Sequence, residues 1–250
     1  MTALVKTGIT VRANPVTLSG EQVRFYDEKG YLVVPGLFDE ESCELIKSVA
    51  DNFAEEDYSV LLNIHRRVDL FLEIMKDPVL VSIAKAIQRH KVVGLNDQYL
   101  FKKPGTPYAK QSWSPHQDNA YVNSAPGAYL QLHIFLDASD KENGGLFYYP
   151  GSHREGILSY DYVKSWKEDF DEQGISHPGW KIKEIPPQYR RVDVVGPKGG
   201  ICLQHGNLIH GSYPNFSSDR SRQQFTAAYL NEGENFREGG TSPKIPIAVE

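Results

Sequence analysis

The chain has 250 residues and a formal net charge of −5 at pH 7, with 40% hydrophobic and 24% charged residues. A chain of this length can bury a substantial core and suits a single domain over residues 1–250. The acidic balance provides no basic footprint for nucleic acid. No run of about 18 apolar residues is present, so we expect no membrane span.

The cysteine content and the N-terminus bear on the cellular compartment. Cys43 and Cys202 are the two cysteines, and two distant cysteines do not make a disulfide framework. The first fifteen residues lack the apolar segment of a signal peptide. These features favour a reducing, cytoplasmic location. The sequence carries no signal for the oligomeric state.

Helix signals occupy the first third of the chain. Ser19 and Gln22 have capping-box spacing, so a short helix is predicted to begin there and to end at Gly30. Asp39 caps a second helix with one apolar face. The dipeptide Asp77-Pro78 opens a third.

After Lys91 the texture changes to short segments rich in Val, Tyr, Phe and Leu between Gly, Pro and Asn turns. Such spacing favours a sandwich or barrel over a parallel sheet. The predicted fold class is therefore α+β: N-terminal helices flanking a double-stranded β-helix, a cupin-like jelly roll. We expect strands over residues 31–34, 97–102, 129–136, 145–149, 192–195, 200–204 and 224–231.

Two segments depart from this rhythm. Residues 1–17 are expected to be an irregular lead-in. Residues 156–190 contain Trp166, Trp180, an acidic run and several prolines. A long connection of this kind is either a functional lid or a solvated excursion, and both interpretations stay open.

A metal-ligating pattern lies in the segment Ser-Pro-His116-Gln117-Asp118. Residues i and i+2 of a strand point to one face, so His116 and Asp118 can grip one ion from one strand. The third ligand is His210 or its competitor His205, both in HGNLIHGSYPN. Two histidines and one carboxylate leave open coordination positions, which suits iron(II). We expect the remaining histidines to be solvent-facing or hydrogen-bonded: His65, His90, His133, His153 and His177.

Four sequence blocks carry a family resemblance. They read FYDEKGYLVVPGLFDEESCELI, LFKKPGTPYAKQSWSPHQD, NGGLFYYPGSHREG and HGNLIHGSYPNFSSDRSR, in this order, across nearly the whole chain. Together they resemble the phytanoyl-CoA dioxygenase (PhyH) family of iron(II)- and 2-oxoglutarate-dependent oxygenases. The resemblance implies a jelly-roll fold, with His116, Asp118 and His210 as iron ligands.

The resemblance also implies an arginine that binds the far carboxylate of 2-oxoglutarate. Arg220 and Arg222 are the candidates, and aligning Ser-Asp-Arg-Ser-Arg with the family pattern favours Arg222. This chain then has one residue more than usual between His210 and the arginine. A guanidinium suits the task because it binds a carboxylate through two hydrogen bonds and stays charged.

Further site residues follow from the family pattern and from strand geometry. Tyr99 and His133 are expected near the co-substrate, although packing would explain both equally, and Ser212 is expected to help bind 2-oxoglutarate. Tyr99 and Lys103 share one face of a strand. If that face turns inward, Lys103 would hold an anionic group of the substrate, 2-oxoglutarate itself, or a protein carboxylate in a structural ion pair. Lys102 would be the inward residue if the strand carries a bulge.

The predicted function is hydroxylation of an unactivated C–H bond of a small polar metabolite, with 2-oxoglutarate converted to succinate and CO2. The cofactors are Fe(II), 2-oxoglutarate and O2, with ascorbate as an assisting reductant. Desaturation, cyclisation or epoxidation with the same cofactors is the alternative. A non-catalytic metal-binding jelly roll is disfavoured, because such a module needs no arginine for 2-oxoglutarate. No CoA-binding signature is recognised.

Overall fold

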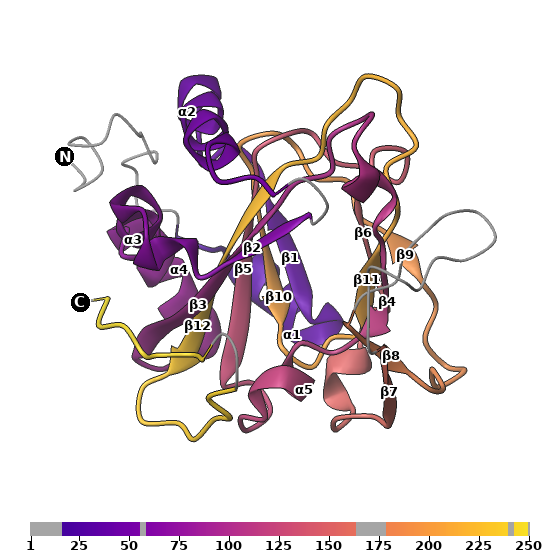
Figure 1. Ribbon diagram of the computed structural model, residues 1–250. Coiled ribbons are helices and arrows are strands. Elements are labelled where there is room, and N and C mark those ends of the chain that lie inside the picture. Colours follow the sequence, from indigo (N-terminus) through magenta and orange to yellow (C-terminus); the bar gives the residue numbers. More distant parts are fainter. Residues whose placement is uncertain (1–16, 56–58, 164–178, 240–242, 250) are drawn as a thin grey trace.

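The computed structural model describes residues 17–55, 59–163, 179–239 and 243–249. In these residues two β-sheets face one another, and helices cover the outer face of the larger sheet (Figure 1). Most of the lead-in over residues 1–17 lies outside the described residues, and so does Trp166. No described helix is both long enough and apolar enough to cross a bilayer.

The α-helices are α1 (Gly20–Lys29), α2 (Glu40–Asp51), α3 (Asp69–Met75), α4 (Pro78–Gln88) and α5 (Asn119–Val122). The strands are β1 (Tyr31–Val34), β2 (Val60–Leu62), β3 (Val92–Leu100), β4 (Trp113–His116), β5 (Tyr129–Phe135), β6 (Leu146–Tyr148), β7 (Tyr160–Val163), β8 (Gly179–Ile182), β9 (Val192–Asp193), β10 (Ile201–His205), β11 (His210–Ser212) and β12 (Gln224–Asn231).

The larger sheet has the order β1-β10-β5-β12-β3-β2 and the smaller sheet the order β4-β11-β6-β9, while β7 and β8 form a separate pair. Every pairing between these strands is antiparallel. Parallel neighbours would need crossover helices, which this arrangement does not use. The predicted double-stranded β-helix is confirmed.

The predicted helix starts are confirmed by their caps. At α1 the Ser19 hydroxyl accepts from the Gln22 N–H and the Gln22 side chain accepts from the Ser19 N–H, a complete capping box. Gly30 ends the helix at φ 82°, a conformation that favours glycine. At α2 the Asp39 carboxylate is the N-cap and accepts from the Ser42 N–H. Helix α3 was not predicted, because its seven residues give too short a periodic pattern.

The two faces of the larger sheet carry different chemistry. Its outer face packs on the helices through Leu130, Leu132, Ile134 and Phe225, all fully buried in one apolar cluster. Burying each such side chain stabilises the fold by about 1.5–3 kcal/mol. The inner face, turned to the smaller sheet, is largely polar near its centre. Directly opposed pairs there are Gln204 with Gln131 and His133 with Thr226. The apolar core therefore lies mainly under the helices, and the barrel interior is free for a polar site.

Candidate active site

Three predicted metal ligands converge in the barrel interior. His116 is the last residue of β4 and His210 is the first of β11, and these two residues pair across the smaller sheet. Their imidazole centroids are 4.2 Å apart. With Asp118, they offer ligand atoms that all lie within 4.8 Å of one another, and all three residues are buried. This cluster has the donor set and the compactness of a mononuclear metal site.

Asp118 reaches the cluster differently from the prediction. We expected His116 and Asp118 to point to one face of a single strand. Instead β4 ends at His116, and Asp118 has right-handed helical backbone angles at the start of α5. The side chains still meet, with 3.4 Å between His116 Nε2 and Asp118 Oδ1. A turn, rather than strand alternation, brings the carboxylate to the histidine.

Both imidazoles present the same nitrogen to the cluster. His116 Nδ1 lies 2.8 Å from the carbonyl oxygen of Ser114, and His210 Nδ1 lies 3.0 Å from that of Leu208. A carbonyl only accepts, so each Nδ1 carries the proton and each Nε2 keeps its lone pair, that of His210 lying 3.3 Å from Gln204 Nε2. Such backbone contacts orient a metal-binding histidine before the metal arrives.

The ionisation states also suit a cation. Burial lowers the pKa of His210 to about 4, so its imidazole is neutral near pH 7. Burial acts to raise the pKa of Asp118, but His210 and His116 outweigh it and lower that pKa to about 2. The cluster therefore combines a neutral imidazole with an ionised carboxylate, the states that metal binding needs.

Arg222 is fully buried, and none of its three guanidinium nitrogens has a hydrogen-bond partner. Burial lowers its pKa to about 10, which leaves it charged at neutral pH. Arg220 differs: it lies at the surface and pairs with Asp140 and Glu142. Of the two predicted candidates, Arg222 is the one with an unmet need for a carboxylate. The residues present thus fit a bound dicarboxylic acid.

Lys102 lies beside Arg222, and Ser212 contacts Lys102. Ser212 follows His210 by two residues on β11, and its hydroxyl accepts from Lys102 Nζ at 2.9 Å. Lys102 is fully buried and donates also to the carbonyls of Tyr213 and Gly144. Burial, with a smaller effect of Arg222, holds the pKa of Lys102 well below its usual value. Lys102 is therefore a second buried basic group at this end of the barrel, beside Arg222.

The predicted inward face of strand β3 was wrong. Tyr99, Phe101 and Lys103 do share a face, but that face turns to the helices, where Tyr99 packs on Phe71 and donates to Gln223. Lys103 forms an ion pair with Asp51 at 2.6 Å. The interior positions are Gln98, Leu100 and then Lys102, because Leu100 pairs with Gln224 and Gln98 with Thr226. The predicted alternation was offset by one residue, which exchanged the inward and outward faces of the strand.

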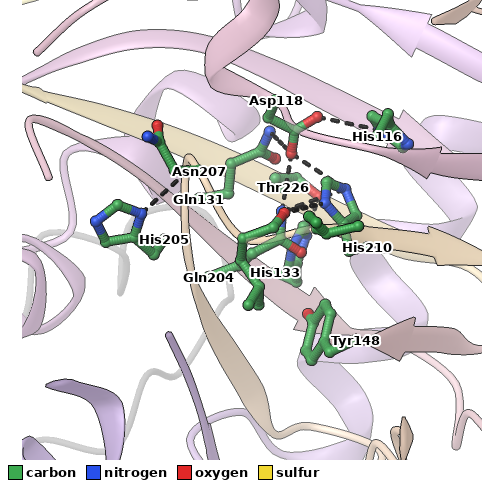
Figure 2. Close-up of polar contacts among 12 residues, drawn as sticks. His116, Asp118, Gln131, His133, Tyr148, Gln204, His205, Asn207, His210 and Thr226 are labelled. Atoms are coloured by element: carbon green, nitrogen blue, oxygen red, sulfur yellow. Dashed lines mark hydrogen bonds and ion pairs between the residues drawn. The ribbon is translucent and has the colours of Figure 1, made fainter. Parts of the chain in front are cut away.

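The other two predicted histidines are separated from the metal cluster. His205 lies at the end of β10, where its Nδ1 accepts from the Asn207 N–H, so it does not compete with His210 (Figure 2). His133 lies in the interior on β5 and contacts Gln204, Thr226 and Gln224. Its expected contact with 2-oxoglutarate stays a prediction.

Two residues that sequence reasoning missed bind Asp118 directly. Gln131 on β5 and Gln204 on β10 both donate to Asp118 Oδ2, Gln204 at 2.8 Å (Figure 2). A signal for them exists. Polar residues stand at alternate positions of the otherwise apolar segment LQLHIF, and Gln204 interrupts the apolar run in ICLQH. In a strand buried on both faces, such alternation marks a polar face in the interior.

The described ends of segment 156–190 are tied to the metal-binding loop. The Gln117 side chain donates to the Gly156 carbonyl and accepts from the Leu158 N–H. Trp180 on β8 stacks on Tyr121 of α5, with ring centroids 4.3 Å apart. These contacts place the β7–β8 pair beside the site (Figure 1). Whether the segment acts as a lid stays a prediction.

Comparison with known proteins agrees with this geometry. The family model described as phytanoyl-CoA dioxygenase (PhyH) matches residues 26–223. A mouse protein, phytanoyl-CoA dioxygenase domain-containing protein 1, is 28% identical over 237 residues, which cover 92% of this chain and 74% of that protein. A probable alpha-ketoglutarate-dependent hypophosphite dioxygenase of Stutzerimonas stutzeri is 28% identical over 225 residues, covering 81% and 75%.

Among solved structures, the non-heme alpha ketoglutarate dependent carbocyclase SnoK from nogalamycin biosynthesis superposes with a TM-score of 0.71 at 22% identity. The superposition covers 94% of this chain and 97% of SnoK. That likeness shows a shared fold, whereas the family match extends over most of the sequence, including His116, Asp118 and His210. The chain therefore belongs to the phytanoyl-CoA dioxygenase family of iron(II)- and 2-oxoglutarate-dependent dioxygenases.

Proposed function

We propose that the protein hydroxylates an unactivated C–H bond of a small polar metabolite. Iron(II) would be held by His116, Asp118 and His210, and 2-oxoglutarate by Arg222. The observation that carries the proposal is the state of Arg222, which is fully buried with every guanidinium nitrogen unpartnered. A buried cation of this kind is costly unless an anion joins it.

This state argues against the non-catalytic alternative. A metal that serves only the fold needs its ligands and no buried cation nearby. Lys102 and Ser212 lie at the same end of the barrel as Arg222, and we assign them to the same carboxylate. Ser212 stands two residues from the metal ligand His210 on the same strand, β11. The three side chains would fix the length and direction of a dicarboxylic acid that reaches the metal.

Bound iron(II) and 2-oxoglutarate supply the oxidising chemistry, in which O2 is consumed and 2-oxoglutarate is converted to succinate and CO2. The chain's own part is to hold two imidazoles and one carboxylate on one side of the metal and to anchor the co-substrate. The burial of all three ligands also limits the access of water to the site.

The interior chemistry supports a polar substrate. Gln131 and Gln204 lie at the carboxylate, and Tyr129 donates to Asn96 on the same inner face of the larger sheet. A long apolar chain would find little apolar surface to contact beside these polar groups, so the lining favours a polar substrate. The predicted anchor of an anionic substrate, Lys103, lies outside the interior. The proposed substrate is therefore a small polar metabolite, without the anionic group that Lys103 was expected to bind.

The test is succinate release under air from the purified protein with iron(II), 2-oxoglutarate and ascorbate, across a panel of small polar metabolites. Stimulation by one compound, with a product that gains one oxygen atom, supports hydroxylation. A product that has lost two hydrogen atoms assigns desaturation or cyclisation instead. Succinate release that is absent with every compound, and absent also without one, would contradict the dioxygenase assignment.

A further inference from the structure

We propose that Gln131 and Gln204 are positioning residues that make Asp118 bind the metal through one oxygen, and that His133 fixes the orientation of Gln204. The inference rests on the metal site proposed above. It concerns side chains that contact the carboxylate rather than the metal. Their contacts join three neighbouring strands of the larger sheet, β12, β5 and β10, to a ligand on the other side of the barrel.

The two amides act on the same oxygen. Gln131 Nε2 and Gln204 Nε2 both donate to Asp118 Oδ2. A carboxylate oxygen has about two lone-pair sites, so Oδ2 has none left. Oδ2 also lies 3.3 Å from His210 Nε2, but that nitrogen carries no proton because Nδ1 donates to Leu208. Oδ1, which lies next to His116 Nε2, remains free for a cation.

A single-oxygen mode matters for the chemistry. The proposed reaction needs three coordination positions besides the protein ligands, two for 2-oxoglutarate and one for O2. A carboxylate that bound through both oxygens would take one of them. Two N–H donors on Oδ2 compete with the metal for that oxygen, and they hold the carboxylate plane in one orientation. The amides thus keep the position open.

The direction of the Gln204 amide follows from its Asp118 end, and the contacts at its other end are compatible with it. Asp118 only accepts, so Gln204 must turn Nε2 toward it and Oε1 away. Gln204 Oε1 lies 3.1 Å from His133 Nε2, which must then carry the proton (Figure 2). On the other side of the ring, His133 Nδ1 lies 2.9 Å from Gln224 Nε2 and 2.8 Å from the Thr226 hydroxyl, both of which can donate. The contacts at both ends of the Gln204 amide are therefore compatible with this one direction.

Burial makes that direction hard to reverse. Gln204 is fully buried, and His133, Gln224 and Thr226 are all buried too. A flipped Gln204 amide would turn Oε1 toward the Asp118 carboxylate and Nε2 toward the His133 N–H. Each buried mismatch costs about 1–3 kcal/mol, since water cannot enter to satisfy it. The strand pairing of Gln204 with Gln131 and of His133 with Thr226 fixes the spacing.

The experiment measures binding of Co(II) alone to the apoprotein, by calorimetry and by the visible absorption of the bound ion. Gln204→Met keeps the side-chain volume and removes the donor, and Gln131→Met does the same on the other strand. We expect each to weaken Co(II) binding by about 10- to 100-fold and to change the absorption, which reports coordination number. Gln223→Met is the matched control. Gln223 is equally buried but accepts from Tyr99 under the helices, so its loss should leave Co(II) binding unchanged.

The role of His133 is tested by combination. His133→Phe should weaken Co(II) binding, because the Gln204 amide loses the donor that orients it. In a Gln204→Met background the same change should have no further effect. Equal effects in both backgrounds would mean that His133 acts only through packing. Circular dichroism verifies folding, and Gln131→Met decides the matter if Gln204→Met does not fold.

The failure of this inference differs from the failure of the metal site itself. If Gln204→Met and Gln131→Met bind Co(II) as the parent does while Asp118→Ala does not bind it, the positioning role is wrong and the metal site stands. If Asp118→Ala also binds Co(II) with unchanged affinity and spectrum, the metal site and the proposed function fall together.

Discussion

Arg222 and Lys102 are adjacent basic residues in the barrel interior, with the Arg222 main-chain N–H donating to the Lys102 carbonyl at 3.2 Å. Both side chains are fully buried, and no carboxylate of the described residues forms an ion pair with either. The Arg222 guanidinium is therefore a buried positive charge without a partner, which a dicarboxylate co-substrate would neutralise. The folded state and the binding of the co-substrate are coupled through this pair.

Replacement of Arg222 should have opposite effects on binding and on stability. Arg222→Met removes the charge-assisted contact to a carboxylate, which is worth about 2–4 kcal/mol, or roughly 30- to 1000-fold in the Kd for 2-oxoglutarate. The free energy of unfolding of the apoprotein should rise by at least about 1 kcal/mol, since a buried unpaired cation is gone. Calorimetric titration and urea unfolding measure the two effects. Arg220→Met, at the surface, should change 2-oxoglutarate binding little, and a larger effect there would return the assignment to Arg220.

Replacement of the two neighbouring lysines should have different effects on 2-oxoglutarate binding. Lys102→Met is expected to weaken 2-oxoglutarate binding by about 1.5–3 kcal/mol, roughly 10- to 150-fold, because Lys102 lies at Ser212. Lys103→Met should leave that binding and substrate-dependent turnover unchanged. Its partly exposed pair with Asp51 contributes only about 0–1 kcal/mol to stability. Binding titrations with both variants decide it, and a loss of substrate-dependent turnover confined to Lys103→Met would restore the anionic-substrate hypothesis.

Each metal ligand should be indispensable. Succinate release is expected to fall to background in each of three variants, His116→Ala, Asp118→Ala and His210→Ala. Two remaining ligands cannot hold the metal in the arrangement that the reaction needs. Asp118→Gly should lose hydroxylation even where iron still binds to the two histidines. Metal content by elemental analysis, measured beside turnover, separates loss of the ion from loss of chemistry. Turnover retained by a folded single variant would remove that residue from the site.

Acid should destabilise the apoprotein because two buried neutral histidines must take up protons on unfolding. Burial lowers the pKa of His133 and of His205 to about 4, while in the unfolded chain both titrate near about 6.5. Their contribution to stability is complete above about pH 6.5 and is lost as the pH falls toward 4, at about 1.4 kcal/mol for each group and pH unit.

Urea midpoints between pH 7.5 and 4.5 measure this loss. His205→Gln should make the decline shallower, because a neutral amide replaces a group that must take up a proton on unfolding. Gln keeps an acceptor for the Asn207 N–H, which His205 Nδ1 binds at 3.0 Å. An unchanged slope in His205→Gln would exclude His205 as a source of the acid sensitivity.

The sequence by itself determined those features that depend on local rules. The Ser19 capping box, the Gly30 stop and the Asp39 cap are each settled within a few residues, and the structure has all three. Strand β12 has the predicted bounds, since its apolar run is long and bounded by polar turns. His116 and Asp118 were identified from a short motif of metal-ligating residue types, and the family resemblance chose His210 over His205.

Tertiary structure alone decided which face of each strand turns inward. Alternation groups Tyr99 with Lys103 and Gln98 with Leu100, but both assignments fit the pattern equally well. The pairing of β3 with β12 decides between them. Phe225 packs against Phe71 under the helices, and Tyr99 is directly opposite Phe225, so Tyr99 lies on the same face. The same pairing sent Lys102 inward to Ser212. The positions of Gln131 and Gln204 at Asp118 likewise depend on two sheets meeting across the barrel, a contact between residues 13 and 86 positions apart in the chain that no local pattern encodes.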